Sequence, residues 1–172
     1  MDNTLLQDNS FAQKIKYLRK KYELSMSELA YILKFKNKTS IGNIEKNIIY
    51  PSFEKLIDIS NLFTVSIDWL VGFTKEPYNE VMIEQVEEKI AVISVTGRRF
   101  IDTVPEHYVN KDLRKKTFTL SERAAIIFYI YYIQFLTGQK LELLYKEPTE
   151  IAKFDKKMNL ILQKLYKLVL NL

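Results

Sequence analysis

Cysteine is absent from this chain of 172 residues, and histidine occurs only once, as His107. Without cysteine the chain has no disulfide framework, no cysteine-ligated zinc site and no thiol nucleophile, which is typical of cytosolic proteins. His107 has no HExxH context, and the sequence contains neither a glycine-rich phosphate loop nor a G-x-S-x-G nucleophile elbow. We therefore expect no catalytic residue, no metal site, no cofactor and no enzymatic activity.

Glycine and proline are also scarce, with four of each in the whole chain. This scarcity argues against a long flexible linker. A chain of this length can form one large or two small domains, and a proline interrupts the helical pattern at Lys75-Glu76-Pro77. We predict a first domain over residues 1–75 and a second domain over residues 76–172.

Apolar runs are too short to cross a membrane. The longest, residues 124–136, is interrupted only by Gln134 and has charged residues nearby at Arg123 and Lys140. Its thirteen residues fall short of the roughly 18 or more that a transmembrane helix needs. The N-terminal stretch MDNTLLQDNS is acidic and polar and lacks a signal-peptide pattern. We expect a cytoplasmic protein without a membrane partner.

Positive charge is in mild excess, with a formal net charge of +5 and a pI of about 9.2. Residues 11–74 hold ten Lys and Arg against six Asp and Glu, whereas residues 76–172 hold fifteen against thirteen. The excess therefore lies mainly in the first domain, as expected where contacts to phosphates supply affinity. The alternative is that these charges only keep the protein soluble.

Residues 11–73 predict five short helices. Apolar residues recur at helical intervals after Ser10 and after Ser25, and each serine is followed three residues later by Gln or Glu, a capping-box pattern. A fourth helix is expected after Pro51-Ser52, and a fifth after Ser66 that ends at Gly72. The expected core face of the fourth helix consists of Phe53, Leu56, Ile57, Ile59, Leu62 and Phe63.

The third of these helices has only a narrow apolar edge. Ile41 and Ile44 lie three residues apart and follow a polar run from Lys36 to Ser40. A helix that packs through one edge leaves most of its surface open. We expect the two isoleucines to face inward, and the outward residues to be Thr39, Ser40, Gly42, Asn43 and Lys46.

This arrangement resembles the lambda-repressor/Cro family of helix-turn-helix domains, also called the xenobiotic-response-element family. The resemblance rests on Leu29-Ala30, Ile41–Glu45 (IGNIE), Pro51-Ser52 and Val65–Gly72 (VSIDWLVG). It covers residues 11–73 and implies a five-helix DNA-binding domain there. Together with the helical patterns of the second domain described below, this predicts an all-α protein in which the DNA-binding domain is followed by a smaller helical bundle for oligomerisation. The resemblance also implies a transcriptional repressor that binds double-stranded DNA at a palindromic operator as a homodimer. The alternative is an ordinary helical bundle in which these apolar residues form only a core.

The expected DNA contacts lie on the third helix and at the start of the second. Asparagine can bind adenine through two hydrogen bonds in the major groove, and serine and threonine can also contact base edges. Hydroxyls, amides and lysines near a helix start can bind phosphates. We therefore expect base contacts from Thr39, Ser40 and Asn43, and backbone contacts from Ser25, Ser27, Lys36, Asn37, Lys38 and Lys46.

The chain departs from the family pattern at three points. Met26 occupies the first position of the second helix, where the family usually has a glutamine that reaches a phosphate, so that contact is missing or altered. Lys34 replaces the glycine of the turn, and the run from Leu33 to Ile41 holds one residue more than usual. Because a positive φ is costly for a residue other than glycine, we expect the extra residue to let the chain turn by another route.

The second domain is predicted to be helical. Residues 79–95 favour an amphipathic helix, although the β-branched run 90–96 would also suit a strand. Thr119 and Glu122 form a capping pattern before the apolar run 124–136, which should be a central helix buried on all sides. Its aromatic residues could fill a core, face a partner or line a ligand pocket.

The last helix carries a sustained apolar seam in which apolar residues recur at intervals of three and four from Ile151 to Leu172. The seam indicates packing against the central helix, a dimer interface, or both. The expected dimer residues are Phe128, Tyr132, Phe135, Met158, Ile161, Leu165, Leu168 and Leu172. An alternative function is an antitoxin-like regulator whose second domain captures another protein. A protein or small-molecule inducer is a further candidate partner of this domain.

Overall fold

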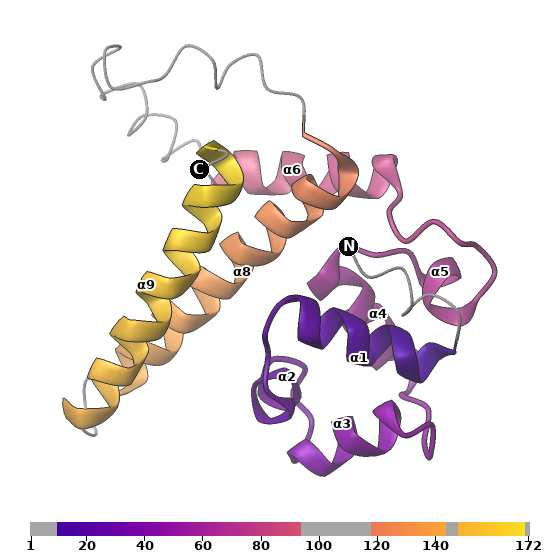
Figure 1. Cartoon of the computed structure of the whole chain (residues 1–172), viewed down its shortest axis with the longest axis horizontal. Helices are drawn as coiled ribbons and strands as arrows, with labels where there is room; N and C mark the ends of the chain where they lie inside the picture. Colours follow the sequence, from indigo (N-terminus) through magenta and orange to yellow (C-terminus); the bar gives the residue numbers. More distant parts are fainter. Residues whose placement is uncertain (1–9, 94–117, 144–147, 171–172) are drawn as a thin grey trace. The chain divides into compact units, whose positions relative to one another are not determined.

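The computed structural model describes residues 10–93, 118–143 and 148–170, and every regular element in these ranges is an α-helix. This confirms the prediction of an all-α protein. The chain divides into two compact units, Met1–Pro77 and Tyr78–Leu172. The first unit contains α1 (Phe11–Lys21), α2 (Met26–Ile32), α3 (Lys38–Glu45), α4 (Phe53–Phe63) and α5 (Ile67–Val71), and the second contains α6 (Glu80–Ile93), α8 (Leu120–Leu143) and α9 (Pro148–Leu170) (Figure 1).

Helix starts in the first unit follow the predicted capping residues. The hydroxyls of Ser10, Ser52 and Ser66 each accept a hydrogen bond from the backbone amide three residues later. At α2, Ser25 and Glu28 form a complete capping box, in which each side chain accepts a hydrogen bond from the other residue's backbone amide. These bonds satisfy amides that have no partner within the helix.

All five helices of the first unit end in the same motif. The residue that follows the last turn has a positive φ, and the next amide bonds back to a carbonyl five residues earlier, which is the longer bond of a Schellman motif. Glycine occupies this left-handed position only at the end of α5. The positions are Glu23 (φ 53°), Lys34 (φ 54°), Asn47 (φ 59°), Thr64 (φ 52°) and Gly72 (φ 97°).

The expectation that the chain avoids a positive φ at Lys34 is therefore wrong. Lys34 adopts the left-handed conformation directly, and the amide of Phe35 donates to the Ala30 carbonyl at 2.8 Å. The hydrogen bonds of the Schellman motif satisfy the last carbonyls of α2 and hold the residue in place.

Replacing Lys34 by glycine should stabilise the first unit by about 0.5–1 kcal/mol. A side chain in the left-handed region costs roughly 1–2 kcal/mol, and the greater freedom of glycine in the unfolded chain offsets about 0.4–1 kcal/mol of the gain. Chemical denaturation of the full chain would measure this difference. Lys34→Ala keeps the Cβ atom and should leave stability nearly unchanged. A Lys34→Gly variant that is less stable than Lys34→Ala would contradict the strain argument.

The core of the first unit is formed by apolar side chains from all five helices. Ile15, Leu29, Ile41, Ile59 and Leu70 are among the fully buried residues. The prediction for Phe53 is wrong, because its side chain is 71% exposed. The buried residues of α4 all lie in its second half, from Ile59 to Phe63, so its first turn projects beyond the core.

A lysine side chain lies within this core. Lys14 is only 4% exposed, and its Nζ donates to the Trp69 carbonyl at 2.6 Å and lies 5.3 Å from the centre of the Trp69 ring. Burial lowers the pKa of Lys14 below its usual value. A cation is favourable beside the carbonyls at the end of a helix, so Lys14 joins α1 to the end of α5.

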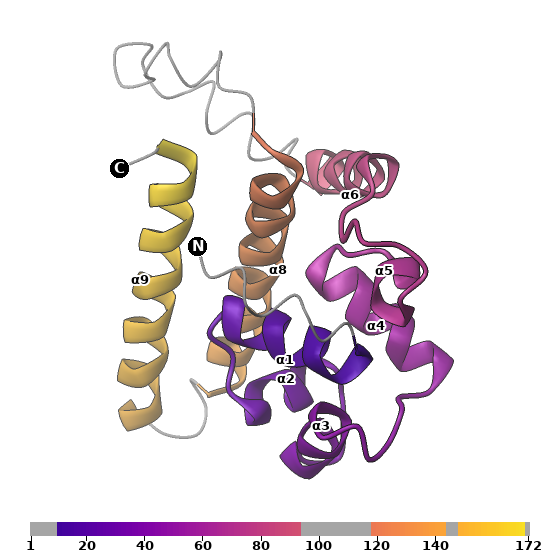
Figure 2. The ribbon, with the colours of Figure 1, turned by 45° about the vertical axis from the view of Figure 1, so that its right-hand side comes forward.

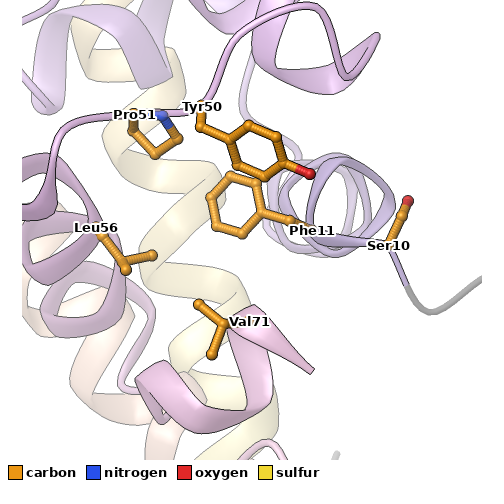
Figure 3. A pocket seen from close by; sticks show the side chains of 6 residues that line it. All are labelled: Ser10, Phe11, Tyr50, Pro51, Leu56 and Val71. Atoms are coloured by element: carbon orange, nitrogen blue, oxygen red, sulfur yellow. The ribbon is translucent and has the colours of Figure 1, made fainter. Parts of the chain in front are cut away.

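A pocket of about 290 Å³ lies between α1, the segment before α4, and α5 (Figure 3). The rings of Phe11 and Tyr50 face each other across a centroid distance of 5.8 Å. Only a serine hydroxyl and a tyrosine hydroxyl bring polar side-chain groups to this pocket, which does not provide a pair of groups for acid–base chemistry. Its lining residues are Ser10, Phe11, Tyr50, Pro51, Leu56 and Val71.

In the second unit, α9 runs antiparallel beside α8, and α6 packs near the start of α8 (Figures 1 and 2). Ile83 of α6 is buried against Ala124 and Ile127 of α8. Arg123 donates two hydrogen bonds to Glu87, at 2.9 and 2.6 Å. The helix predicted over residues 79–95 is confirmed for Glu80–Ile93, whereas residues 94–96 lie outside the described ranges.

The central helix α8 is buried on some sides only. Ala124, Ile127, Phe128, Tyr132 and Leu136 are buried. The other apolar residues of the run 124–136 remain partly accessible within one chain, namely Ala125, Ile126, Tyr129, Ile130, Tyr131, Ile133 and Phe135. The prediction of burial on every side is thus met only in part. Across the described ranges, no helix combines the length and apolarity that a membrane span requires.

Candidate nucleic-acid interface

Helices α2 and α3 pack against each other and are joined by the turn 33–37. After the Schellman motif at Lys34, the side chain of Asn37 begins α3. Its Oδ1 accepts hydrogen bonds from the amides of Thr39 and Ser40 at 3.1 and 3.3 Å. Because both ends of the turn are fixed by hydrogen bonds, the direction of α3 relative to α2 is defined.

The orientation of α3 agrees with the pattern of its sequence. Ile41 and Ile44 are buried, as predicted. Thr39 and Lys46 are exposed, while Ser40 and Asn43 are partly exposed. The expected base-contacting residues thus belong to the part of α3 that the core leaves accessible.

Gly42 is partly exposed, as are Ser40 and Asn43. A Cβ atom at this residue would lie 3.8 Å from the sulfur of Met26, which is itself exposed, so Gly42 lies beside the first residue of α2. Met26 begins α2, as the family comparison predicted, and its side chain offers no hydrogen-bond donor. The glutamine contact to phosphate that is usual in the family therefore cannot be made here by the same group.

A paired charge fixes the last turn of α3 to α1. Arg19 donates from Nε to Glu45 at 2.5 Å and from Nη2 to the other carboxylate oxygen at 2.9 Å, and its Nη1 donates to the Leu24 carbonyl at 3.0 Å. The side chains of Arg19 and Glu45 are 12% and 4% exposed. Hydrogen bonding to Glu45 raises the pKa of Arg19 above its usual value.

No capping or spacing pattern in the sequence singles out this pair. Arg19 follows the buried Leu18, and Glu45 follows the buried Ile44, so each charge flanks a core position. That placement was the only signal available, because the two residues are 26 positions apart. A bidentate pair of this kind has strict geometry, and here it joins the last turn of α3 to α1.

The start of α2 provides fewer groups for a phosphate than the sequence suggested. The amide of Ser25 donates to Glu28 at 2.8 Å, and its hydroxyl accepts from the Glu28 amide at 3.1 Å. The Glu28 carboxylate also places negative charge where an anion would bind. Ser25 therefore offers only its hydroxyl proton, while the side chain of Ser27 is exposed.

Lysines lie at both ends of α3. Lys36 and Lys38 are exposed beside its start, together with Asn37, and Lys46 is exposed at its end. The oxygen of the Asn37 side chain is used in the helix cap, which leaves the Nδ2 group as its possible phosphate donor. Lys38 and Lys46 are separated by about 12 Å along the helix axis, from a rise of about 1.5 Å per residue.

The residues expected at a dimer interface differ in accessibility. Phe128, Tyr132 and Ile161 are buried within one chain, where Lys157 Nζ lies 5.5 Å from the centre of the Tyr132 ring. Burial raises the pKa of Tyr132 above its usual value. Leu172 lies outside the described ranges. The partly accessible residues of the set are Phe135, Met158, Leu165 and Leu168.

Comparison with known proteins agrees with the geometry of the first unit. A family model described as helix-turn-helix matches residues 15–70. YobD of Bacillus subtilis (strain 168), an uncharacterized HTH-type transcriptional regulator, is 31% identical over 78 residues, which cover 45% of this chain and 69% of that protein. A crystal structure of a transcriptional regulator from Listeria innocua is 26% identical, covers 59% of this chain and 97% of that chain, and has a TM-score of 0.36. The chain therefore belongs to the lambda-repressor/Cro family of helix-turn-helix proteins and is a DNA-binding transcriptional regulator.

Proposed function

We propose that the protein is a cytoplasmic repressor that binds a palindromic operator as a homodimer, with residues 1–75 as the DNA-binding domain and residues 76–172 as the oligomerisation domain. The observation that carries this proposal is the geometry of α3, which we name the recognition helix. Its Ile41 and Ile44 are buried in the core, while its polar residues remain accessible. One such helix reads only a few base pairs, so two linked copies are needed to combine their binding energies.

The contacts divide into two kinds. Thr39, Ser40 and Asn43 read base edges, because they lie on the accessible side of α3. The surrounding groups bind phosphates and set the position of the helix in the groove. This second set comprises Ser25, Ser27, Lys36, Asn37, Lys38 and Lys46.

Replacing Asn43 by alanine should weaken binding to the operator by about 1–3 kcal/mol, because a bidentate contact to adenine is lost. Binding to random DNA should change little. The operator would first be obtained by selecting bound fragments from a random DNA pool, and affinities would then be measured on both kinds of duplex at one salt concentration. Equal losses of affinity on the two duplexes would show that Asn43 does not contribute to base recognition.

Lys38→Gln is the matched control, since it lies on the same helix but should bind phosphate. We expect this variant to lose affinity equally on operator and random DNA. The slope of log affinity against log salt should become shallower by about one unit, as expected for one lost phosphate contact. An unchanged slope would make Lys38 an ordinary surface lysine.

Dimerisation through the second unit is supported by its remaining apolar surface. Seven apolar residues of the run 124–136 in α8 stay partly accessible within one chain, and Leu160, Leu162 and Tyr166 of α9 are exposed. Large apolar patches are uncommon on monomeric proteins. The same surface also supports the alternative of an antitoxin-like regulator that captures a different protein.

Purification from the native cell distinguishes these two functions. A protein that elutes as a dimer and carries DNA supports the repressor, whereas a stoichiometric complex with a different protein supports the alternative.

A further inference from the structure

The lysines of α9 are gathered along one edge of the helix. At 3.6 residues per turn, all five fall within an arc of about 100°. Between the first and the last of them the only acid is Asp155, which projects from the other side of the helix, and Glu150 lies one turn before the first. This lysine edge consists of Lys153, Lys156, Lys157, Lys164 and Lys167.

The lysine edge is exposed at its two ends. Lys153, Lys156 and Lys167 are exposed, while Lys157, which lies over the Tyr132 ring of α8, and Lys164 are partly buried. Burial and the charge of Lys164 together lower the pKa of Lys157. Like charges that crowd one another destabilise a helix unless an anion lies nearby. From Lys153 to Lys167 the edge extends about 21 Å.

The overall charge of the second unit conceals this feature. Helix α6 has four glutamates and one lysine, whereas α9 has five lysines and two acids, so the two helices carry opposite net charges of three. These charges cancel in the total, which is why the second half of the chain looks almost neutral in composition. Their separation makes α9 a surface suited to a polyanion.

We propose that the lysine edge of α9 is a second DNA-binding surface, which contacts the phosphate backbone and reads no sequence. The proposal rests on the DNA-binding function of the first unit. Double-stranded DNA carries about one negative charge per 1.7 Å of its axis, so it matches a linear array of cations. Because the first unit binds DNA on the same chain as α9, even weak phosphate contacts by α9 add to the total affinity.

The test compares two triple variants with the same change in net charge. In the first, Lys153→Gln, Lys156→Gln and Lys167→Gln neutralise the exposed part of the edge. In the control, Asn79→Asp, Gln85→Glu and Gln134→Glu add three negative charges at exposed polar residues of α6, its N-terminal flank and α8, outside the lysine edge. Circular dichroism and sedimentation without DNA would verify the fold and the oligomeric state of both variants.

The measurement is the slope of log affinity against log salt, on operator and on random duplexes. The lysine variant should have a slope shallower by about two to three units, at about 0.9 per lost phosphate contact. Its loss of affinity should be equal on both duplexes, and the control should keep the wild-type slope.

Three results would overturn the proposal. An unchanged slope in the lysine variant would mean that the edge does not contact DNA. An equal change of slope in both variants would mean that only the net charge of the protein matters, and not the position of the lysines. If the lysine variant self-associates differently from the wild type without DNA, in a salt-dependent way, then the edge contacts a second copy of the chain and not DNA. Failure of the wild-type chain to prefer any duplex over random DNA would instead count against the proposed repressor function, so the two failures are distinguishable.

Discussion

Replacement of Glu45 by leucine is expected to lower the free energy of unfolding of the first unit by about 3–5 kcal/mol. The Arg19 guanidinium would keep its bond to the Leu24 carbonyl but lose both hydrogen bonds to the carboxylate, at a site where its side chain is only 12% exposed. A buried charge without its partner is more costly than the absence of both charges. Urea denaturation followed by circular dichroism would measure the loss.

An exposed pair in the same unit provides the control. Lys55 and Asp58 are 2.8 Å apart but are 24% and 48% exposed, so Asp58→Asn should change stability by only about 0–1 kcal/mol. The double variant Arg19→Leu with Glu45→Leu should be more stable than the sum of the two single losses suggests. If Glu45→Leu has no larger effect than Asp58→Asn, the pair does not hold α3 in place.

Truncation after Pro77 should weaken binding to the palindromic operator by about 10²- to 10⁴-fold, because each first unit would then bind its half-site alone. The cut is placed after Pro77 because the Pro77 carbonyl accepts a hydrogen bond from the Ser66 amide at 2.8 Å. Removing that carbonyl would disturb the start of α5. Sedimentation should find the fragment monomeric, and circular dichroism should find it folded.

A duplex with one half-site separates lost dimerisation from lost recognition. The truncated and full-length proteins should bind it with similar affinity, apart from any phosphate contacts made by α9. A fragment that remains dimeric and binds the palindrome at full strength would place the dimer interface in the first unit, and would leave the apolar surface of α8 for another partner.

Local chemistry explains which parts of the fold could be predicted. The starts of α1, α2, α4 and α5 followed from serines that bond amides within the next three residues. Such capping signals depend only on residues that lie within three positions of one another. The unusual helix end at Lys34 was misjudged, because the preference of glycine for a positive φ was weighed without the hydrogen bonds of the motif that encloses it.

Long-range partners explain what could not be predicted. The bond from Lys14 to Trp69 joins residues 55 positions apart, and the sequence alone makes Lys14 resemble any surface lysine. The orientation of α3 was predictable because its two isoleucines define an inner edge. The contact of Gly42 with Met26 was not, because it depends on how the neighbouring helix α2 packs.

The burial of the Arg19–Glu45 pair also predicts how the protein responds to ionic strength. The Debye length falls from about 10 Å at 0.1 M salt to about 3 Å at 1 M, which weakens interactions between exposed charges but affects a buried pair much less. Lysines exposed around α3 should therefore lose their attraction for phosphates, while the internal bond between α1 and α3 persists. Concentrated salt should release the protein from DNA with its melting temperature nearly unchanged, so that it is recovered folded and ready to bind again after dilution.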